Sequence, residues 1–259
     1  MSFATAADAL WLFLTRVEQR SGLSAEERNA VLDLPAMPRQ LQAHRDIVHL
    51  DEQVDHACLV AEGLVARFAQ MNDGRRQNLS LHIAGDMVGL NAMILPAAYT
   101  PLTALTAATI FQIPHAALHD LIHRHPAIGT ALWRECVVEA AIARERLVSM
   151  GRRDARSRLA HMFCEMAVRS RHIGRYNAGR FAFPVTQEQI ADMLGLTPVH
   201  VNRTMQALRG EELVQFSQRE AVILDWPGLA FAAEFDPVYL HLGTFPIEAR
   251  QAPALRMDG

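Results

Sequence analysis

The chain contains no lysine, and all 25 of its basic residues are arginine. A DNA-contacting surface would favour arginine, but the bias reaches every part of the 259 residues, so a GC-rich coding sequence explains it more simply. Cysteine is also scarce. Cys58, Cys136 and Cys164 form no CxxC pair and no metal-ligand spacing, so we expect reduced core thiols rather than a disulfide framework or a zinc site.

Long apolar runs and catalytic signatures are missing as well. No run of eighteen apolar residues occurs, and the apolar stretch near the N-terminus has no basic flank, so we expect no membrane span, no secretory signal and a cytoplasmic location. The motifs HExxH, GxSxG and the phosphate-binding GxxxxGK are absent, and we therefore expect no enzyme and no cofactor. With 50% hydrophobic residues, the chain can still form two domains with cores of their own.

The net charge of −3 hides a separation of charge along the chain. Residues 152–220 hold 11 arginines against 7 acidic residues, a net of +4, whereas residues 1–151 carry −4 and residues 221–259 carry −3. Binding to phosphates releases counterions and needs a local excess of positive charge. The distribution therefore favours nucleic acid as the partner of the basic segment.

The most informative stretch has the pattern of a helix-turn-helix. Thr186 is a good N-cap, and Gln189 three residues later predicts a capping box at the start of a first helix. Gly195 can adopt the left-handed conformation that ends this helix. Thr197 then caps a second helix with Pro198 at its first position, where the missing N–H costs nothing.

The second helix of this pattern has two different faces. The face predicted to be buried repeats at spacings of four and three, through Val201, Met205 and Leu208. The outward face holds side chains that can donate to or accept from base edges in a major groove, namely His200, Asn202, Arg203 and Gln206.

These residues define a predicted DNA-reading surface. We expect Arg203 to make a bidentate contact to guanine, with His200 and Asn202 contacting neighbouring bases. Contacts to phosphates from helix N-termini are expected from Thr186, Gln187 and Thr197. The alternative is a helical hairpin inside an enzyme, with the same polar residues merely solvated.

The surrounding sequence resembles a known family. Two short apolar runs around a polar turn, 211–216 and 218–224, suit the hairpin of a winged helix. Together with Leu-Thr-Pro-Val-His-Val-Asn-Arg-Thr at 196–204, they resemble the DNA-binding domain of the Crp/Fnr family of bacterial transcription regulators. Relatives that bind the best-known sites carry an acidic residue where this chain has Val199, so its operator should differ.

The resemblance implies both a fold and partners. The implied fold is α+β, with an N-terminal cyclic-nucleotide-binding-like β-roll (a cupin-like jelly roll), a long dimerisation helix and a C-terminal winged helix-turn-helix domain. The implied assembly is a cytoplasmic homodimer on palindromic double-stranded DNA, with RNA polymerase as a further partner. Whether it activates or represses is left open by the sequence.

The region between residues 39 and 114 has the pattern of short strands separated by turns. Asn72-Asp-Gly74 lies between two alternating runs and predicts a hairpin, and about eight such strands would form a roll. Before this region, Ser24 and Glu27 have capping-box spacing, which predicts the second of two N-terminal helices.

We place the sensor domain at residues 1–125, the dimerisation helix at 126–151 and the winged-helix domain at 152–226. Gly151 is the predicted hinge between the helix and the DNA-binding domain. A C-terminal extension at 227–259 holds one more short helix and ends in a Pro-rich segment, and we assign it no chemistry.

The predicted dimerisation helix carries a repeat of apolar and small residues at spacings of three and four. Its members are Leu132, Cys136, Ala140, Ala143, Leu147 and Met150. Small side chains in the middle of the repeat would let two such helices approach closely. The alternative is a helix that packs only on its own domain.

The effector of the sensor domain is not evident from the sequence. Cyclic-nucleotide-binding members need an acidic residue for the ribose and an arginine for the phosphate, but Leu90 follows Gly89 here and no arginine occurs in residues 99–105. A cyclic phosphate buried without a cation is costly, so we expect no cAMP binding. Only Cys58 lies in the first 135 residues, which excludes the iron–sulfur ligand set of the oxygen-sensing branch.

The histidines of the sensor domain indicate the strongest alternative function. His115, His119 and His123 recur every four residues, and adjacent pairs at this spacing can chelate zinc or nickel, although a solvated polar face explains them as well. A haem sensor would need an axial ligand such as His56 or His82. The second function hypothesis is therefore a small-molecule or metal sensor whose β-roll ligand controls the DNA-binding domain.

Overall fold

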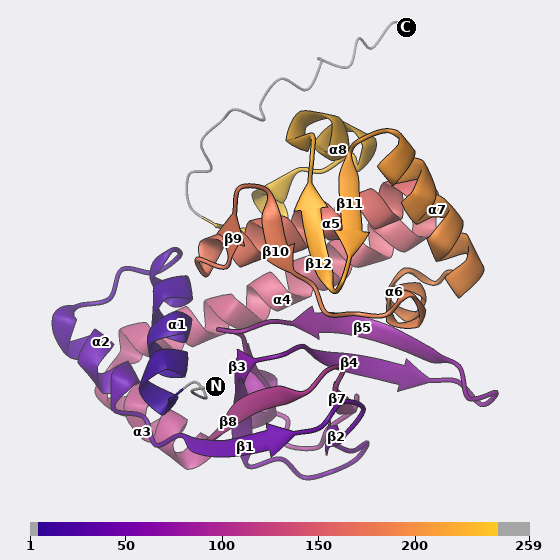
Figure 1. Ribbon diagram of the computed structural model, residues 1–259. Coiled ribbons are helices and arrows are strands. Elements are labelled where there is room, and N and C mark those ends of the chain that lie inside the picture. The colour runs from indigo at the N-terminus through magenta and orange to yellow at the C-terminus, as the bar shows by residue number, and fades with distance from the viewer. Residues whose placement is uncertain (1–4, 243–259) are drawn as a thin grey trace, which may run out of the picture.

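A computed structural model describes residues 5–242 and confirms the predicted α+β fold (Figure 1). An N-terminal β-roll is followed by a long helix and by a second domain of helices and a small sheet. The Pro-rich end of the predicted C-terminal extension, residues 243–259, lies outside the described residues.

The roll consists of two antiparallel sheets of four strands each. One sheet has the order β1-β8-β3-β6, with bounds Met37–Leu41, Ala108–Pro114, His56–Glu62 and Met87–Val88. The other has the order β2-β7-β4-β5, with bounds Asp46–Val48, Leu102–Ala104, Val65–Gln70 and Arg76–His82. The predicted hairpin at Asn72-Asp-Gly74 joins β4 to β5, and Gly74 has the left-handed φ of 84° that this turn requires.

Three helices close one end of the roll. They are α1 (Ala6–Glu18), α2 (Ala25–Leu32) and α3 (His115–Arg124). The predicted capping box of Ser24 and Glu27 is present at the start of α2. Apolar side chains of α1 pack against the roll and against Ile128, Ala131 and Leu132, near the start of the long helix that follows α3. This end of the sensor domain therefore has one continuous core.

A long helix leads away from the roll toward the second domain. This helix, α4 (Pro126–Arg152), has 27 residues, and α5 (Ala155–His172) follows it after a short break. The predicted hinge at Gly151 is wrong, because Gly151 is still helical. The break comes at Arg153, which follows the last residue of α4. Asp154 then caps α5, because its side chain accepts a hydrogen bond from the Ser157 N–H.

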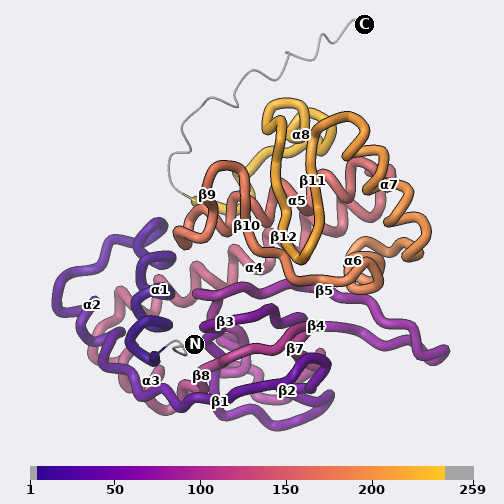
Figure 2. Tube along the Cα trace, in the orientation of Figure 1, coloured from indigo at the N-terminus to yellow at the C-terminus, as the bar shows by residue number. Residues whose placement is uncertain are grey.

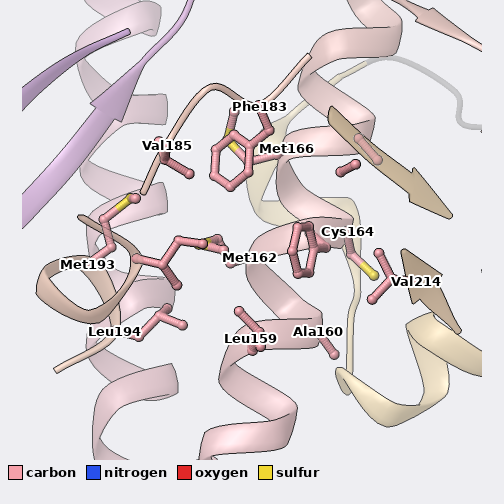
Figure 3. Close-up of a cluster of buried hydrophobic side chains, with 14 of the residues drawn as sticks. Leu159, Ala160, Met162, Cys164, Met166, Phe183, Val185, Met193, Leu194 and Val214 are labelled. Carbon is pink, nitrogen blue, oxygen red and sulfur yellow. The ribbon is translucent and has the colours of Figure 1, made fainter. Parts of the chain in front are cut away.

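The second domain is a winged helix. Helices α6 (Gln187–Leu194), α7 (Pro198–Gly210) and α8 (Trp226–Ala232) surround α5 together with a sheet of order β11-β12-β10-β9. The strands are Val214–Ser217, Glu220–Ile223, Arg180–Ala182 and Tyr176–Asn177. Their shared core contains Phe163 of α5 edge-on to Phe183. Figure 3 shows Phe183 with other side chains of this core, among them Met162, Leu194 and Val214.

The winged helix is docked on the roll of its own chain. Figure 2 shows the β4–β5 hairpin running beneath α6, and the apolar core of the winged helix continues into Leu81 of β5. The Gln77 side-chain amide donates to the carbonyl of Asp192 at 2.7 Å, close to the C-terminus of α6. The Gln189 amide donates to the carbonyl of Leu105 at 2.8 Å. Both hydrogen bonds join the roll to the first helix of the helix-turn-helix.

A short segment after α8, which we call the strap (residues 233–242), returns to the sensor domain. Leu240 lies in its 3₁₀ turn (Pro237–Leu240) and is 1% exposed between α4 and α5. The guanidinium of Arg20, in the turn after α1, donates to the Leu240 carbonyl at 2.9 Å, and the Tyr239 hydroxyl donates to Glu165 at 3.1 Å. The sequence assigned this segment no role, yet it links both ends of the chain.

Loss of the Leu240 side chain should therefore destabilise the protein. Leu240→Ala is expected to lower the free energy of unfolding by about 2–5 kcal/mol, because it leaves a cavity between α4 and α5. Val238→Ala in the same segment is the control, since Val238 is exposed and should change stability by less than about 0.5 kcal/mol. Chemical denaturation followed by circular dichroism measures both, and equal effects of the two variants would contradict the packing described for the strap.

Candidate nucleic-acid interface

The two helices of the helix-turn-helix begin and end at the residues that the sequence indicated. At the start of α6, Thr186 accepts from the Gln189 N–H at 3.1 Å, and the Gln189 side chain accepts from the Thr186 N–H at 2.9 Å. Gly195 ends α6 with a left-handed φ of 63°. Thr197 then caps α7 by accepting from the His200 N–H, with Pro198 at the first position. These local hydrogen bonds fix the angle at which α7 leaves the turn.

One face of α7 is held in the core and the opposite face is exposed. Val201, Met205 and Leu208 are buried, as predicted. Thr204 is buried beside them, and its hydroxyl donates to the His200 carbonyl. Figure 1 shows α7 at the outer edge of the winged helix, away from the roll. The helix is therefore anchored on one side and open to a partner on the other.

The predicted base-reading residues lie on the open side. Asn202, Arg203 and Gln206 are exposed, and His200 is half-buried. The Asn202 side-chain amide donates to the Gln187 carbonyl oxygen at 3.2 Å, which joins the two helices on this face. No hydrogen bond or ion pair to another described residue holds the Arg203 guanidinium. Thr186 and Thr197 are exposed at the two helix N-termini, and Gln187 is half-buried.

The wing brings a further arginine that the sequence analysis did not identify. Gln218 and Arg219 form the turn between β11 and β12, and both have positive φ, at 51° and 65°. Two consecutive left-handed residues match the type I′ turn of a two-residue hairpin loop. The only signal in the sequence was a polar pair between two short apolar runs. Arg219 is exposed at this tip.

Ion pairs within the winged helix determine which of its arginines remain available to bind phosphates. Arg156 pairs with Glu211, and Arg180 pairs with Glu220 at 3.1 Å. The guanidinium groups of Arg203, Arg209 and Arg219 have no such partner among residues 5–242. These three arginines therefore concentrate the free positive charge on α7 and the wing, where a DNA backbone would lie against the domain.

The residues predicted to line the dimer interface differ in how far they are exposed. Leu132 is buried in the core beneath α1, and Met150 lies beside Gly195 of its own subunit. Cys136 is half-buried, whereas Ala140, Ala143 and Leu147 are exposed. The exposed stripe of α4 also contains large side chains that the sequence analysis missed, namely Trp133, Val137 and Val148. The open apolar face thus keeps Ala140, Ala143 and Leu147 of the predicted set, and has Trp133 and Val137 in place of Leu132 and Cys136.

The surroundings of Gly89 lack the acidic residue that cyclic-nucleotide-binding members are expected to carry. The cavity beside Gly89 is small, about 20 Å³, and a larger one of about 460 Å³ lies next to it between β5 and α4, with Arg67, Asn91 and Tyr99 lining both. Leu90 is buried where an acidic residue would hold a ribose. Arg67 lies at this cavity, but it pairs with Glu139 at 3.6 Å and donates to Asn91. Arg67 is thus held by partners of its own subunit, and the absence of cAMP binding stays a prediction.

The histidines proposed as metal or haem ligands differ in burial and in the residues that they contact. His115 is buried at the start of α3, where burial lowers its pKa, while His119 and His123 are exposed. Within residues 5–242, no cluster of three or more His, Cys, Asp or Glu side chains could hold a metal ion. His56 contacts Asp55 at 2.9 Å, and His82 contacts Ser80 at 2.7 Å.

Comparison with known proteins identifies the family. The chain matches the family model of the cyclic nucleotide-binding domain over residues 38–125 and that of the Crp-like helix-turn-helix domain over residues 157–231. The chain belongs to the Crp/Fnr family of transcription regulators. It is a DNA-binding regulator of this type, and the comparisons do not favour the alternative of a sensor with a secondary DNA domain. No helix of this regulator within residues 5–242 could span a membrane.

Individual relatives agree with this assignment. The regulator is 28% identical to the transcriptional activator protein FnrL of Cereibacter sphaeroides, over 76% of this chain and 80% of the relative. It is 24% identical to the nitrogen fixation regulation protein FixK of Azorhizobium caulinodans, over 80% and 84%. The solved structure of FixK2 from Bradyrhizobium japonicum has 25% identity and a TM-score of 0.70, and covers 77% of this chain and 98% of that one.

The turn glycine of this interface offers a test of its geometry. Gly195→Ala should lower the free energy of unfolding by about 1–2 kcal/mol, because a Cβ at φ 63° is strained, and here it would also press on Met150. Gly210→Ala at the end of α7 is the matched control, since nothing lies within 4 Å of its added Cβ. Thermal unfolding of the two variants measures the difference, and a stable Gly195→Ala protein would argue against the left-handed turn.

Proposed function

We propose that this regulator binds palindromic DNA as a homodimer, with two α7 helices in successive major grooves and half-sites one helical turn apart. The observation that supports this most strongly is the division of α7 into a buried face and an exposed face. Because Val201, Met205 and Leu208 anchor the helix, Asn202, Arg203 and Gln206 are presented to solvent in a fixed orientation. Residues held in this way can bind base edges at little entropic cost.

The exposed side chains have distinct roles in the proposal. Arg203 donates two hydrogen bonds to guanine, and His200, Asn202 and Gln206 contact neighbouring bases. The Gln187 side chain orients the Asn202 amide through their 3.2 Å hydrogen bond. Phosphates are bound by Thr186, Gln187 and Thr197 at the helix N-termini, by Arg209 in the last turn of α7 and by Arg219 at the tip of the wing.

The exposed stripe of α4 is the proposed contact between subunits. Trp133, Val137, Ala140 and Leu147 follow one another along the helix at spacings of four, three and seven, with Val148 beside Leu147, and each is exposed in the single chain. Burial of these side chains against the same stripe of a second copy would remove their apolar surface from water. Ala140 and Ala143 would let the two helices approach closely.

Several finer properties belong to the same proposal. The regulator acts in the cytoplasm, uses no catalytic cofactor and does not respond to cAMP, because Leu90 takes the place of the acidic residue that would hold a ribose and Arg67 is paired with Glu139. RNA polymerase is the expected further partner at a promoter.

Removal of Arg203 should weaken specific DNA binding without unfolding the domain. Arg203→Ala is expected to cost on the order of 1–3 kcal/mol on an operator selected from random duplexes, and to relax the preference for guanine at one position. Fluorescence anisotropy on specific and scrambled duplexes measures this effect. Arg124→Ala in the sensor domain is the control and should bind as the wild type does. Unchanged affinity of Arg203→Ala with a native circular dichroism spectrum would remove Arg203 from the interface.

A charge placed on the α4 stripe should separate the subunits. Leu147 is 72% exposed in the single chain, so Leu147→Glu should leave the subunit folded, yet raise the dimer dissociation constant at least about tenfold by burying an unpaired carboxylate. Leu50→Glu, at an exposed apolar residue of the roll, is the control. Sedimentation equilibrium distinguishes the two, and a Leu147→Glu dimer as tight as the wild type would place the interface elsewhere.

A further inference from the structure

Val199 is the most exposed large apolar side chain among the described residues, at 81%. It lies in the first turn of α7, directly after Pro198. The subunit gains no packing from a side chain in this position. A β-branched residue also forms helix less readily than alanine does. Folding of the subunit therefore does not explain why valine stands here.

The position of Val199 on the helix relates it to DNA. Val199, Asn202, Arg203 and Gln206 follow the spacing i, i+3, i+4, i+7, which places them along one face of an α-helix. Each of the other three is exposed, polar and able to hydrogen bond with a base. Val199 is thus the N-terminal member of the DNA-facing row and its only apolar one.

Valine cannot form a hydrogen bond with a base or a phosphate. In the major groove, the apolar group that a base presents is the C5-methyl group of thymine. Resting on the proposed function, we infer that Val199 is a specificity-determining residue that contacts a thymine methyl group in each half-site of the operator. This contact would select thymine over cytosine, which has no methyl group and presents an amino group instead.

Helix geometry limits where this thymine lies. Val199 and Arg203 are four residues apart, which is about 6 Å along an α-helix, whereas stacked base pairs are about 3.4 Å apart. The thymine should therefore lie within about two base pairs of the guanine that Arg203 contacts. A selected operator contains only a few thymines within this distance of the guanine, so each of them can be tested in turn.

Replacement of thymine by uracil provides the test, because it removes the methyl group and leaves all hydrogen-bonding groups in place. The operator is first selected from random duplexes with the full-length protein. Uracil is then placed at each candidate thymine, and binding is measured by fluorescence anisotropy at fixed salt concentration. At one position, uracil should weaken wild-type binding about fourfold in one half-site and about 15-fold in both, the effect of one buried methyl group per site.

Variants assign the effect to Val199. Val199→Ala should bind thymine and uracil duplexes within a factor of about 1.5 of each other, whereas Phe231→Ala, which removes another exposed apolar side chain, on α8, should keep the wild-type ratio. Val199→Glu should shift the preference at this position to cytosine, because the amino group of cytosine can donate a hydrogen bond to the carboxylate. The inference is overturned if no uracil substitution weakens wild-type binding, or if Val199→Ala keeps the full ratio.

The same measurements separate this inference from the proposed function. A selection that yields no consensus sequence would overturn both. A consensus whose binding depends on Arg203, but shows no thymine methyl contact through Val199, would overturn this inference alone and leave the proposed function intact.

Discussion

The arrangement of the two domains depends on a buried carboxylate, Asp86, at which an arginine of the sensor domain and an arginine of the winged helix meet. Arg16 of α1 pairs with Asp86, and Arg169 of α5 donates to it at 2.7 Å and to the Leu81 carbonyl at 2.9 Å. Asp86 is 4% exposed. A buried ion pair adds little net stability, but loss of one partner leaves an uncompensated charge that costs several kcal/mol. The domains therefore have few ways to move apart without exposing or stranding these groups.

Further charges extend this network into both domains. Burial lowers the pKa of Arg16 to about 10 and the Glu135 carboxylate opposes this shift, so the guanidinium stays charged at neutral pH. Burial alone would raise the pKa of Glu165, but Arg146 and Arg169 outweigh it and hold that pKa below its usual range. Arg20 pairs with Glu135 and also donates to the strap. The network, the strap and α6 on β5 hold the winged helix on the sensor domain, while the outer face of α7 stays open.

The sensor domain shows that a fold can be kept although residues expected to bind its usual ligand differ. Residues 38–125 match the cyclic nucleotide-binding domain, and the two sheets of the roll are complete. Its interior nevertheless contains apolar side chains, with Leu90 buried and Arg67 paired to Glu139. The sheets depend on the alternation of inward and outward side chains, whereas ligand binding depends on a few polar groups at the cavity. Substitution at those positions can therefore change ligand binding without disturbing the roll.

The sequence by itself determined the helix-turn-helix, because its signals act over a few residues. Thr186 and Gln189 are three residues apart, Gly195 needs only its own backbone conformation, and the two faces of α7 follow from helical periodicity. Such local hydrogen bonds and spacings can be identified without knowledge of the rest of the chain. The same holds for the Asn72-Asp-Gly74 hairpin.

Tertiary structure alone decided the features that join distant parts of the chain. Asp86 and Arg169 are 83 residues apart, and Arg20 and Leu240 are 220 apart, so no local pattern relates them. The exposed stripe of α4 differs from the predicted one because α1 packs over Leu132 and leaves Trp133 open. Periodicity shows that a helix has an apolar face, but the neighbours that cover part of that face determine which residues remain for a partner.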